Sequence, residues 1–318
     1  MRCLVTGATG QIGSELTLAL RAGHGEQNVV AAGHRTEPRP ALRDSGPFVY
    51  LDVTAGDDLR RVVEEWRVDT IFHLAAVLSA KGEQAPDLAW QVNMVGLRNV
   101  LQLAREHNLR VFWPSSIAVF GPRTPRTSTP QDTVLCPTTM YGVTKAAGEF
   151  LCEYYATACG VDVRGVRYPG IISAETPPGG GTTDYAVEMF YAAVRGEPYT
   201  CFVGPDTVLP MMYMPDALRA ACQLMDADPN ALQHHADFNV TAMSFSAAEL
   251  AAEIKRHLPG FRCRYQPDFR QDIADSWPRT IDDSAARREW GWRPQYDLAT
   301  MTADMLRRLG ERHARGEL

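Results

Sequence analysis

Lysine is scarce in this chain. Lys81, Lys145 and Lys255 are the only lysines among 318 residues, the other 29 basic residues are arginines, and the net charge is −6. A negative net charge gives no basic footprint for nucleic acid and no polybasic patch for a membrane surface. We therefore expect neither nucleic acid nor membranes among the partners of this protein.

Long apolar runs are also lacking. No stretch approaches the roughly 20 apolar residues that a membrane-spanning helix needs. The first predicted strand begins at residue 2, which leaves no space for a targeting segment before it. The sequence thus predicts a cytoplasmic protein, with one large domain or two closely packed ones.

Paired cysteines are a further absence. The seven cysteines are an odd number without any Cys-x-x-Cys spacing, which predicts a reducing compartment and neither a disulfide framework nor a zinc site. His234 and His235 have no partners at metal-ligand spacing, so we expect them at a loop or helix end. No metal is expected. The cysteines are Cys3, Cys136, Cys152, Cys159, Cys201, Cys222 and Cys263.

A glycine-rich turn stands at the start of the chain. Residues 2–6 are typical of a short buried strand and residues 14–20 of a helix, and Gly7, Gly10 and Gly13 lie between them. Glycines permit a tight turn and a close approach of the backbone to a pyrophosphate, and a helix N-terminus offers free N–H groups to it. Because the strand–turn–helix context is present, the sequence predicts dinucleotide binding.

Tyr141 and Lys145 are spaced four residues apart in a predicted helix, which places both side chains on one face. A neighbouring ammonium favours a phenolate, so we expect the pKa of Tyr141 to fall from about 10 towards the working pH. Because nearly all other basic residues are arginines, a lysine at this position indicates a need for a compact charge with three hydrogen-bond donors. The alternative is an ordinary helix pair.

Strands and helices alternate through the first half, which predicts a Rossmann-type, doubly wound parallel sheet of the α/β class. Ligands of such sheets bind at the carboxyl ends of the strands. We expect strands at 28–32, 48–51, 70–74, 110–113 and 161–167, and helices at 57–66, 86–107 and 141–158.

The pattern changes after residue 167. A turn-rich loop at 177–183 is followed by predicted helices at 184–195, 215–225, 246–257 and 298–309. We therefore expect an NAD(P)-binding domain at 1–170, which also receives part of 200–235. Residues 171–318 should form a smaller, discontinuous substrate-binding and capping region.

The order of the short motifs indicates a family. With the glycines at 7–13, the stretch 73–76, the serines at 115–116 and the pair Tyr141/Lys145, the chain resembles the extended short-chain dehydrogenase/reductases, which include UDP-galactose 4-epimerase. Within them it is similar to the short-chain type of L-threonine 3-dehydrogenase, and not to the zinc-dependent type. The second resemblance rests on residues 78–80, 167–173, 178–186, 209–214, 275–278 and 290–292, so it covers nearly the whole chain.

The resemblance implies oxidation of the L-threonine hydroxyl to 2-amino-3-ketobutyrate with NAD. Tyr141 would be the general base, and Lys145 would hold its phenolate and contact the nicotinamide ribose. Ser116 aligns with the catalytic serine of the family and would donate to the reacting oxygen, while Ser115 could face cofactor or substrate. A serine pair after a strand could instead bond only to nearby backbone.

The remaining site residues follow from their places in these motifs. We expect the cofactor to contact Gly7, Gly10, Gln11, Ile12, Gly13, His34, Arg35, Asp52, Val53, Leu74, Ala75, Ala76, Tyr141, Lys145, Tyr168, Pro169 and Ile171. We expect the substrate to contact Ser79, Ser116, Tyr141, Gly181, Thr182, Asp184 and Trp277. Ser79 could instead form a loop turn, Asp184 a helix cap, and Trp277 packing under a loop.

One position departs from the pattern. The second strand should end on an acid that binds the adenosine ribose, but Gly33 stands there, followed by His34 and Arg35. A carboxylate repels a ribose 2′-phosphate, whereas Arg35 and protonated His34 would attract it. We therefore expect NAD with NADP tolerated. Arg35 could also merely stack on the adenine or point to solvent.

Several functions remain open from the sequence. The substrate could be another β-hydroxy-α-amino acid, such as phenylserine, because a single altered wall residue would suffice. The scaffold also suits a nucleotide-sugar epimerase or dehydratase, with arginines of the second half holding a diphosphate. A redox-inert NAD(P)-binding scaffold is a non-enzyme alternative. The expected partners are a small amino acid and a second copy of the chain, which would form a homodimer through the helices at 86–107 and 141–158.

Overall fold

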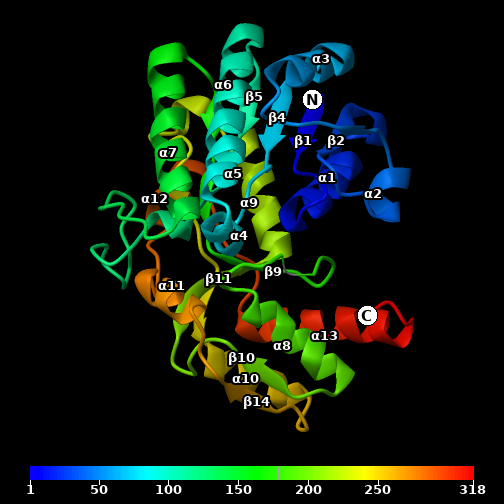
Figure 1. Ribbon diagram of the computed structural model, residues 1–318, viewed down its shortest axis with the longest axis vertical. Helices are drawn as coiled ribbons and strands as arrows, with labels where there is room; N and C mark the ends of the chain where they lie inside the picture. Colours follow the sequence, from blue (N-terminus) through cyan, green and yellow to red (C-terminus); the bar gives the residue numbers. More distant parts are fainter. Residues whose placement is uncertain (178) are drawn as a thin grey trace.

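The fold is built on a parallel sheet. A computed structural model describes every residue except 178, which belongs to the loop predicted at 177–183 (Figure 1). The six strands of the largest sheet are all paired in parallel. Their order is β3-β2-β1-β4-β5-β7, that is Phe48–Tyr50, Val29–Gly33, Cys3–Thr6, Thr70–His73, Arg110–Phe112 and Val163–Arg164. This doubly wound order confirms the predicted Rossmann-type class.

Helices cover both faces of this sheet, so its central strands are buried on both sides. In β1, Cys3 and Val5 pack into one apolar cluster and Leu4 into another. The first cluster includes residues of α1 (Gln11–His24), α9 (Met214–Asp226) and α12 (Ser284–Trp290). The second includes residues of α3 (Gly56–Trp66), α6 (Gly96–His107) and α7 (Met140–Cys159), and Figure 1 shows α6 beside α7.

Two of the sheet strands are interrupted and continue in a second small sheet. After Pro114, the chain resumes as β6 (Ser115–Ser116), and after Gly165 it resumes as β8 (Val166–Tyr168). A side chain at Gly165 would have its Cβ 2.0 Å from the Trp113 carbonyl oxygen, so glycine permits this bend. The single strand predicted at 161–167 is therefore split in two. β8 pairs in parallel with β6 and with β12 (Phe238–Asn239).

The long helix predicted at 86–107 is continuous but irregular. It consists of α5 (Pro86–Trp90), a π-helical turn (Gln91–Val95) and α6. The Asn93 side chain in that turn bonds to both backbone groups of Val77 and to the Thr144 hydroxyl. The turn thus ties the loop after β4 to α7.

The second half forms a third apolar cluster. It joins α8 (Tyr185–Arg195), α10 (Ala247–His257), α13 (Leu298–Ala314) and β11 (Val208–Tyr213). Figure 1 places α10, β10 and β14 at the opposite end of the molecule from α3 and α6. β11 connects the halves, since it pairs with β9 and leads into α9. The other strands there are β9 (Gly170–Ile172), β10 (Tyr199–Cys201), β13 (Met243–Ser246) and β14 (Cys263–Tyr265).

The predicted helices of this half all exist, and α13 runs five residues beyond the predicted end at 309. Four short helices had no predicted counterpart, namely α2 (Pro40–Asp44), α4 (Ser79–Gln84), α11 (Arg270–Ser276) and α12. In the described part of the chain, no helix has the length and apolarity to cross a membrane. Residues 1–177 and 179–318 also contain no group of His, Cys, Asp or Glu side chains that could hold a metal ion.

Candidate active site

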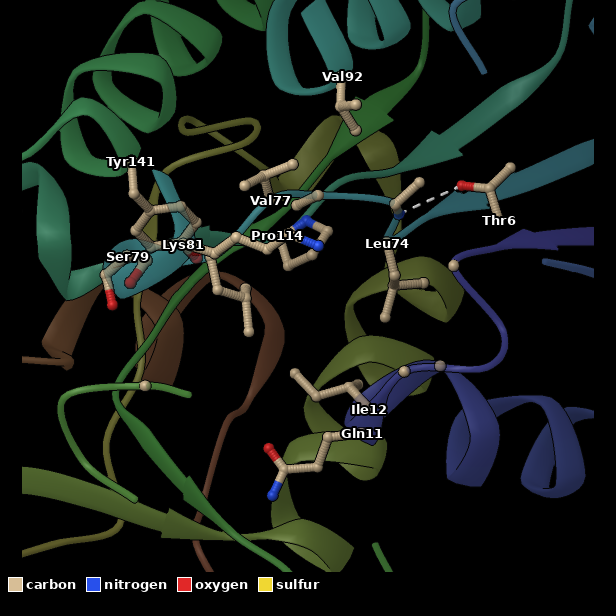
Figure 2. A pocket seen from close by; sticks show the side chains of 18 of the residues that line it. Thr6, Gln11, Ile12, Leu74, Val77, Ser79, Lys81, Val92, Pro114 and Tyr141 are labelled. Atoms are coloured by element: carbon tan, nitrogen blue, oxygen red, sulfur yellow. Dashed lines mark hydrogen bonds between the residues drawn. The ribbon is translucent and has the colours of Figure 1, made fainter. Parts of the chain in front are cut away.

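A cavity of about 850 Å³ opens at the carboxyl ends of the sheet strands. All the residues that the sequence predicted for cofactor, substrate and catalysis line it. Figure 2 shows Ser79, Lys81 and Tyr141 at one end and Gln11 and Ile12 at another. The sheet therefore brings together positions that are far apart in the sequence.

The glycine turn forms a cradle that side chains would fill. Gly7 has φ +68°, and a Cβ there would lie 2.7 Å from the Ala75 backbone nitrogen. A Cβ on Gly13 would lie 2.2 Å from the Gly7 carbonyl oxygen. Helix α1 begins directly after this turn, at Gln11. A turn this close to the loop after β4, with helix N–H groups at its edge, fits a pyrophosphate. The Gln11 amide nitrogen is also buried without a hydrogen-bond partner among the described residues.

Tyr141 lies in the first turn of α7, just after the N-cap Thr139. The Ser116 hydroxyl lies near enough to its phenol to favour the phenolate. Burial outweighs this effect and raises the pKa of Tyr141 to about 12. The expected fall of this pKa towards working pH is therefore wrong for the ligand-free site, because desolvation of the phenolate outweighs its stabilisation.

The surroundings of Lys145 explain why its positive charge does little to lower the pKa of Tyr141. Its ammonium donates to the Pro114 carbonyl oxygen at 2.5 Å and lies 5.7 Å from the centre of the Tyr141 ring. Burial lowers the pKa of Lys145 to about 7, while Cys152 and Glu149 oppose that shift. The lysine is thus on the same face as Tyr141, as predicted, but its charge is itself destabilised by burial.

Ser115 and Ser116 point in different directions because successive residues of a strand alternate. The Ser115 hydroxyl donates to a carboxylate oxygen of buried Glu149 at 2.5 Å. The Ser116 hydroxyl accepts from the Ala118 backbone nitrogen at 3.2 Å, and its proximity acts to lower the pKa of Tyr141. Of the two serines, Ser116 faces the phenol.

The loop before α8 carries a free polar group. The Thr182 hydroxyl is buried and has no hydrogen-bond partner in the described part of the chain. Asp184 precedes α8 but does not cap it, because its carboxylate accepts from the backbone N–H groups of Gly180 and Gly181 at 2.7 and 2.6 Å. Burial raises the pKa of Asp184. The two glycine amides that could have bound a substrate carboxylate are therefore already occupied.

Two more of the residues predicted to contact the substrate line this cavity. Ser79 begins α4 and Trp277 follows α11, and both are buried lining residues. A small polar contact and a large apolar cover are thus available to a substrate.

The cavity wall is crowded at Gly33, the position at which the sequence pattern predicts an acidic residue. A Cβ on Gly33 would lie 2.9 Å from Phe48 Cζ and 2.9 Å from Thr9 Cγ2. Asp52 accepts two hydrogen bonds from Thr54, which hold the pKa of its carboxyl below the usual value. His34 Nε2 lies 3.6 Å from the Asp52 carboxylate, and both side chains are exposed.

Sequence reasoning missed several residues of the site. Lys81 lines the cavity, and the scarcity of lysine was a signal that could have found it. Gln91 and Val92 also line it, from the π-helical turn, which no periodicity revealed. Thr6 accepts from the Ala75 backbone nitrogen at 3.4 Å, the contact drawn in Figure 2, and the residue types gave no sign of it.

Comparison with known proteins places this site in a family. A profile of the NAD dependent epimerase/dehydratase family matches residues 3–241. An uncharacterized epimerase/dehydratase of Staphylococcus haemolyticus is 50% identical over 98% of both chains. A GalE-like L-threonine dehydrogenase from Cupriavidus necator, in its holo form, is 53% identical with a TM-score of 0.95 and covers 97% of this chain and 100% of its own.

A third comparison agrees with these two. An L-threonine dehydrogenase from Clostridium difficile is 50% identical, has a TM-score of 0.96 and covers 98% of each chain. These similarities extend over the cavity and both halves of the fold, since nearly every residue is matched. The chain belongs to the NAD dependent epimerase/dehydratase family.

Proposed function

We propose that this protein oxidises the β-hydroxyl of L-threonine to 2-amino-3-ketobutyrate by hydride transfer to NAD(P)⁺. The observation that carries the proposal is a single cavity that holds a glycine cradle, the neighbouring Tyr141 and Ser116 hydroxyls, and the Thr182 hydroxyl, which has no hydrogen-bond partner among the described residues. The two matched structures of L-threonine dehydrogenases support the choice of substrate.

The residues present fit a nicotinamide dinucleotide. The turn from Gly7 to Gly13 would hold the pyrophosphate, since a Cβ at either end would fill that space. Asp52 and Val53 would flank the adenine, and the strand end at 74–76 would lie beneath the pyrophosphate. Tyr168, Pro169 and Ile171 would line the nicotinamide side. When bound, the cofactor supplies the hydride acceptor.

The chain's own groups would handle the proton and the developing charge. Tyr141 takes the proton of the substrate hydroxyl as a general base while the Cβ–H bond breaks and the carbonyl forms. Ser116 donates to the reacting oxygen, since its hydroxyl lies near the Tyr141 phenol in the same cavity. Lys145 supports the phenolate and would contact the nicotinamide ribose. The high pKa of ligand-free Tyr141 makes this support necessary.

A zwitterionic substrate needs partners for both charges. Thr182 would donate to the carboxylate, because its hydroxyl has no partner in the described part of the chain, and Ser79 offers a second hydroxyl. Asp184 would order the loop by holding the Gly180 and Gly181 amides, so its contribution to binding is indirect. Trp277 would close the site against water.

Both NAD and NADP should be accepted. The side chains of Thr9 and Phe48 take the space of the acid that would repel a 2′-phosphate, and Arg35 and His34 line the same end of the cavity. A family profile described as NAD dependent supports NAD, while these residues support tolerance of NADP.

The organisation and assembly of the chain are part of the proposal. We assign cofactor binding to residues 1–170 together with β11 and α9, because α9 packs with α1 under the sheet. We assign substrate binding and capping mainly to 171–318. A homodimer in the cytoplasm is the expected form, supported by the exposed apolar side chains Phe150 and Tyr154 on α7.

The test is an absorbance assay for reduced cofactor with L-threonine, phenylserine and UDP-sugars. Turnover with L-threonine, at a kcat/KM above that for phenylserine, is the expected result. Preference for phenylserine would reassign the substrate, and turnover with UDP-sugars alone would favour an epimerase or dehydratase. Cofactor binding without any turnover would leave a redox-inert scaffold, and each of these three outcomes contradicts the proposal.

A further inference from the structure

We propose that Glu149 is a positioning residue, which acts through Ser115 and Arg167 to hold Ser116 against Tyr141. The inference rests on the proposed function, because it assigns Ser116 and Tyr141 to one reaction. Glu149 itself does not line the cavity, so any effect on turnover must pass through the groups that it binds.

The contacts of Glu149 form a closed network. One carboxylate oxygen accepts from the Ser115 hydroxyl at 2.5 Å and from Arg167 Nε at 2.9 Å. The other accepts from Arg167 Nη2 at 2.8 Å. The paired, two-oxygen geometry is the strongest that an arginine and a carboxylate can form. It leaves little freedom for the strand that carries Ser115.

Arg167 extends the network to two further segments. Its Nη1 donates to the Gln131 carbonyl oxygen at 2.9 Å and to the Asn239 side-chain oxygen at 3.2 Å. The Asp237 carboxylate lies 3.6 Å from Nη2. Every nitrogen of the guanidinium is therefore engaged, and the group is fixed relative to the fold.

The three linked segments are those that carry the catalytic groups. Glu149 is four residues after Lys145 on α7, one helical turn further along. Ser115 precedes Ser116 in β6, and Arg167 precedes Tyr168 in β8. In the register of the two strands, Ser115 pairs with Arg167 and Ser116 with Tyr168. A shift at Glu149 would therefore move Ser116 relative to Tyr141.

The charges of this network are costly to bury. Burial raises the pKa of Glu149, and Arg167 and Ser115 oppose the rise. Burial would lower the pKa of Arg167, but the Glu149 carboxylate outweighs it and the pKa rises. Such a pair often contributes little net stability, which leaves room for a role in geometry. The alternative is a purely structural ion pair.

The experiment compares Glu149→Gln, Ser115→Ala and Glu153→Gln with the wild-type protein. Glu153 is one turn beyond Glu149 on the same helix and pairs with His235 at the surface, so it is the matched control. For each protein we would measure kcat and KM with L-threonine, the Kd of reduced cofactor by fluorescence, and Tm.

The expected result is a loss of kcat without a loss of binding. Misplacement of catalytic groups by about 1 Å costs on the order of 10²-fold, so Glu149→Gln should lower kcat by about that factor. Ser115→Ala, which leaves the ion pair intact, should lower kcat by about tenfold. KM and Kd should stay within about threefold, and Glu153→Gln should match the wild type.

Four outcomes would overturn the proposal. A lower Tm with wild-type kcat would make the pair structural only, and a raised KM with unchanged kcat would make it part of the binding site. If Glu149→Gln does not fold, wild-type kcat in Ser115→Ala decides against the proposal. If the wild-type protein itself shows no turnover, the proposed function and the positioning role both fail. The other outcomes concern the variants only, so the two kinds of failure can be told apart.

Discussion

The Lys145 ammonium lies 4.5 Å from the centre of the Trp113 ring and donates to the Pro114 carbonyl oxygen. The indole face and the carbonyl dipole are both attractive to a cation. They do not compensate for the water that is lost, because burial still lowers the pKa of Lys145 to about 7. Lys145 is therefore held in a site that destabilises its own charge.

This gives a pH-dependent stability for the cofactor-free protein. Lys145 has a folded-state pKa near 7, below its ordinary value of 10.5, so the unfolded chain binds more protons between these values and stability rises with pH there. Lys145→Met should be more stable than the wild type below pH 7, by on the order of a few kcal/mol, and this advantage should vanish towards pH 10. Thermal unfolding across this range, with exposed Lys255→Met as control, tests it. A difference that does not depend on pH would contradict the burial argument.

Tyr141→Phe should abolish most turnover and leave cofactor affinity intact. Loss of a general base costs roughly 10²- to 10⁴-fold in rate. Because burial raises the pKa of Tyr141 to about 12, the phenolate fraction grows with pH, but Lys145, with a pKa of about 7, loses its supporting charge above neutral pH, so wild-type kcat/KM should rise to about pH 7 and level off above it. The readouts are reduced-cofactor absorbance and fluorescence titration, with exposed Tyr154→Phe as control. Unchanged turnover in Tyr141→Phe would remove this residue as the base.

Arg35→Ala should change cofactor choice and little else. If Arg35 binds the 2′-phosphate, its removal should lower kcat/KM for NADP by roughly tenfold or more, with NAD nearly unaffected. Arg43→Ala is the control, because that exposed arginine lies in α2 and pairs there with the adjacent Asp44. A wild-type preference for NAD of several hundredfold would refute the idea before any variant is made.

The features that could be predicted are those encoded by residues close together in the sequence. The glycine turn and the Tyr141/Lys145 spacing are local patterns with fixed geometry, so they located the sheet edge and the cavity. The split of the strand at Gly165 could not be predicted, because it is caused by the Trp113 carbonyl, which is distant in sequence. The π-helical turn at 91–95 likewise depends on what Asn93 binds.

The electrostatics of the site were the least predictable part. The spacing of Tyr141 and Lys145 correctly placed both on one face, but the sign of the pKa shift of Tyr141 depends on burial, which spacing does not report. Only the family resemblance distinguished Ser116 from Ser115 in the sequence, and strand alternation together with the Ser115–Glu149 hydrogen bond now gives a physical reason. Asp184 also looked like a cap, and its partners are the loop amides instead.

The apolar face of α7 should mediate dimer formation. Phe150 and Tyr154 are 67% and 59% exposed, and Val143 lies on the same side of the helix. Phe150→Glu should convert a dimer into a monomer, since it would bury unpaired charges. Phe269→Glu is the matched control, as an equally exposed phenylalanine outside that face. Light scattering after gel filtration gives the mass, and a monomeric wild type would end the prediction.

Gly142 should be essential because it lets α7 approach the turn after β6. A Cβ at this position would lie 2.2 Å from the Ala118 carbonyl oxygen and 2.8 Å from Pro137 Cβ. Gly142→Ala should therefore cost about 1–3 kcal/mol of stability and lower kcat, since it separates Tyr141 from Ser116. Gly310→Ala is the matched control, because a Cβ there meets nothing within 4 Å, and it should stabilise α13 by about 0.5–1 kcal/mol. Chemical denaturation and kcat measure both effects. If Gly142→Ala matched the wild type in stability and turnover, close packing of α7 would not be what brings Tyr141 to Ser116.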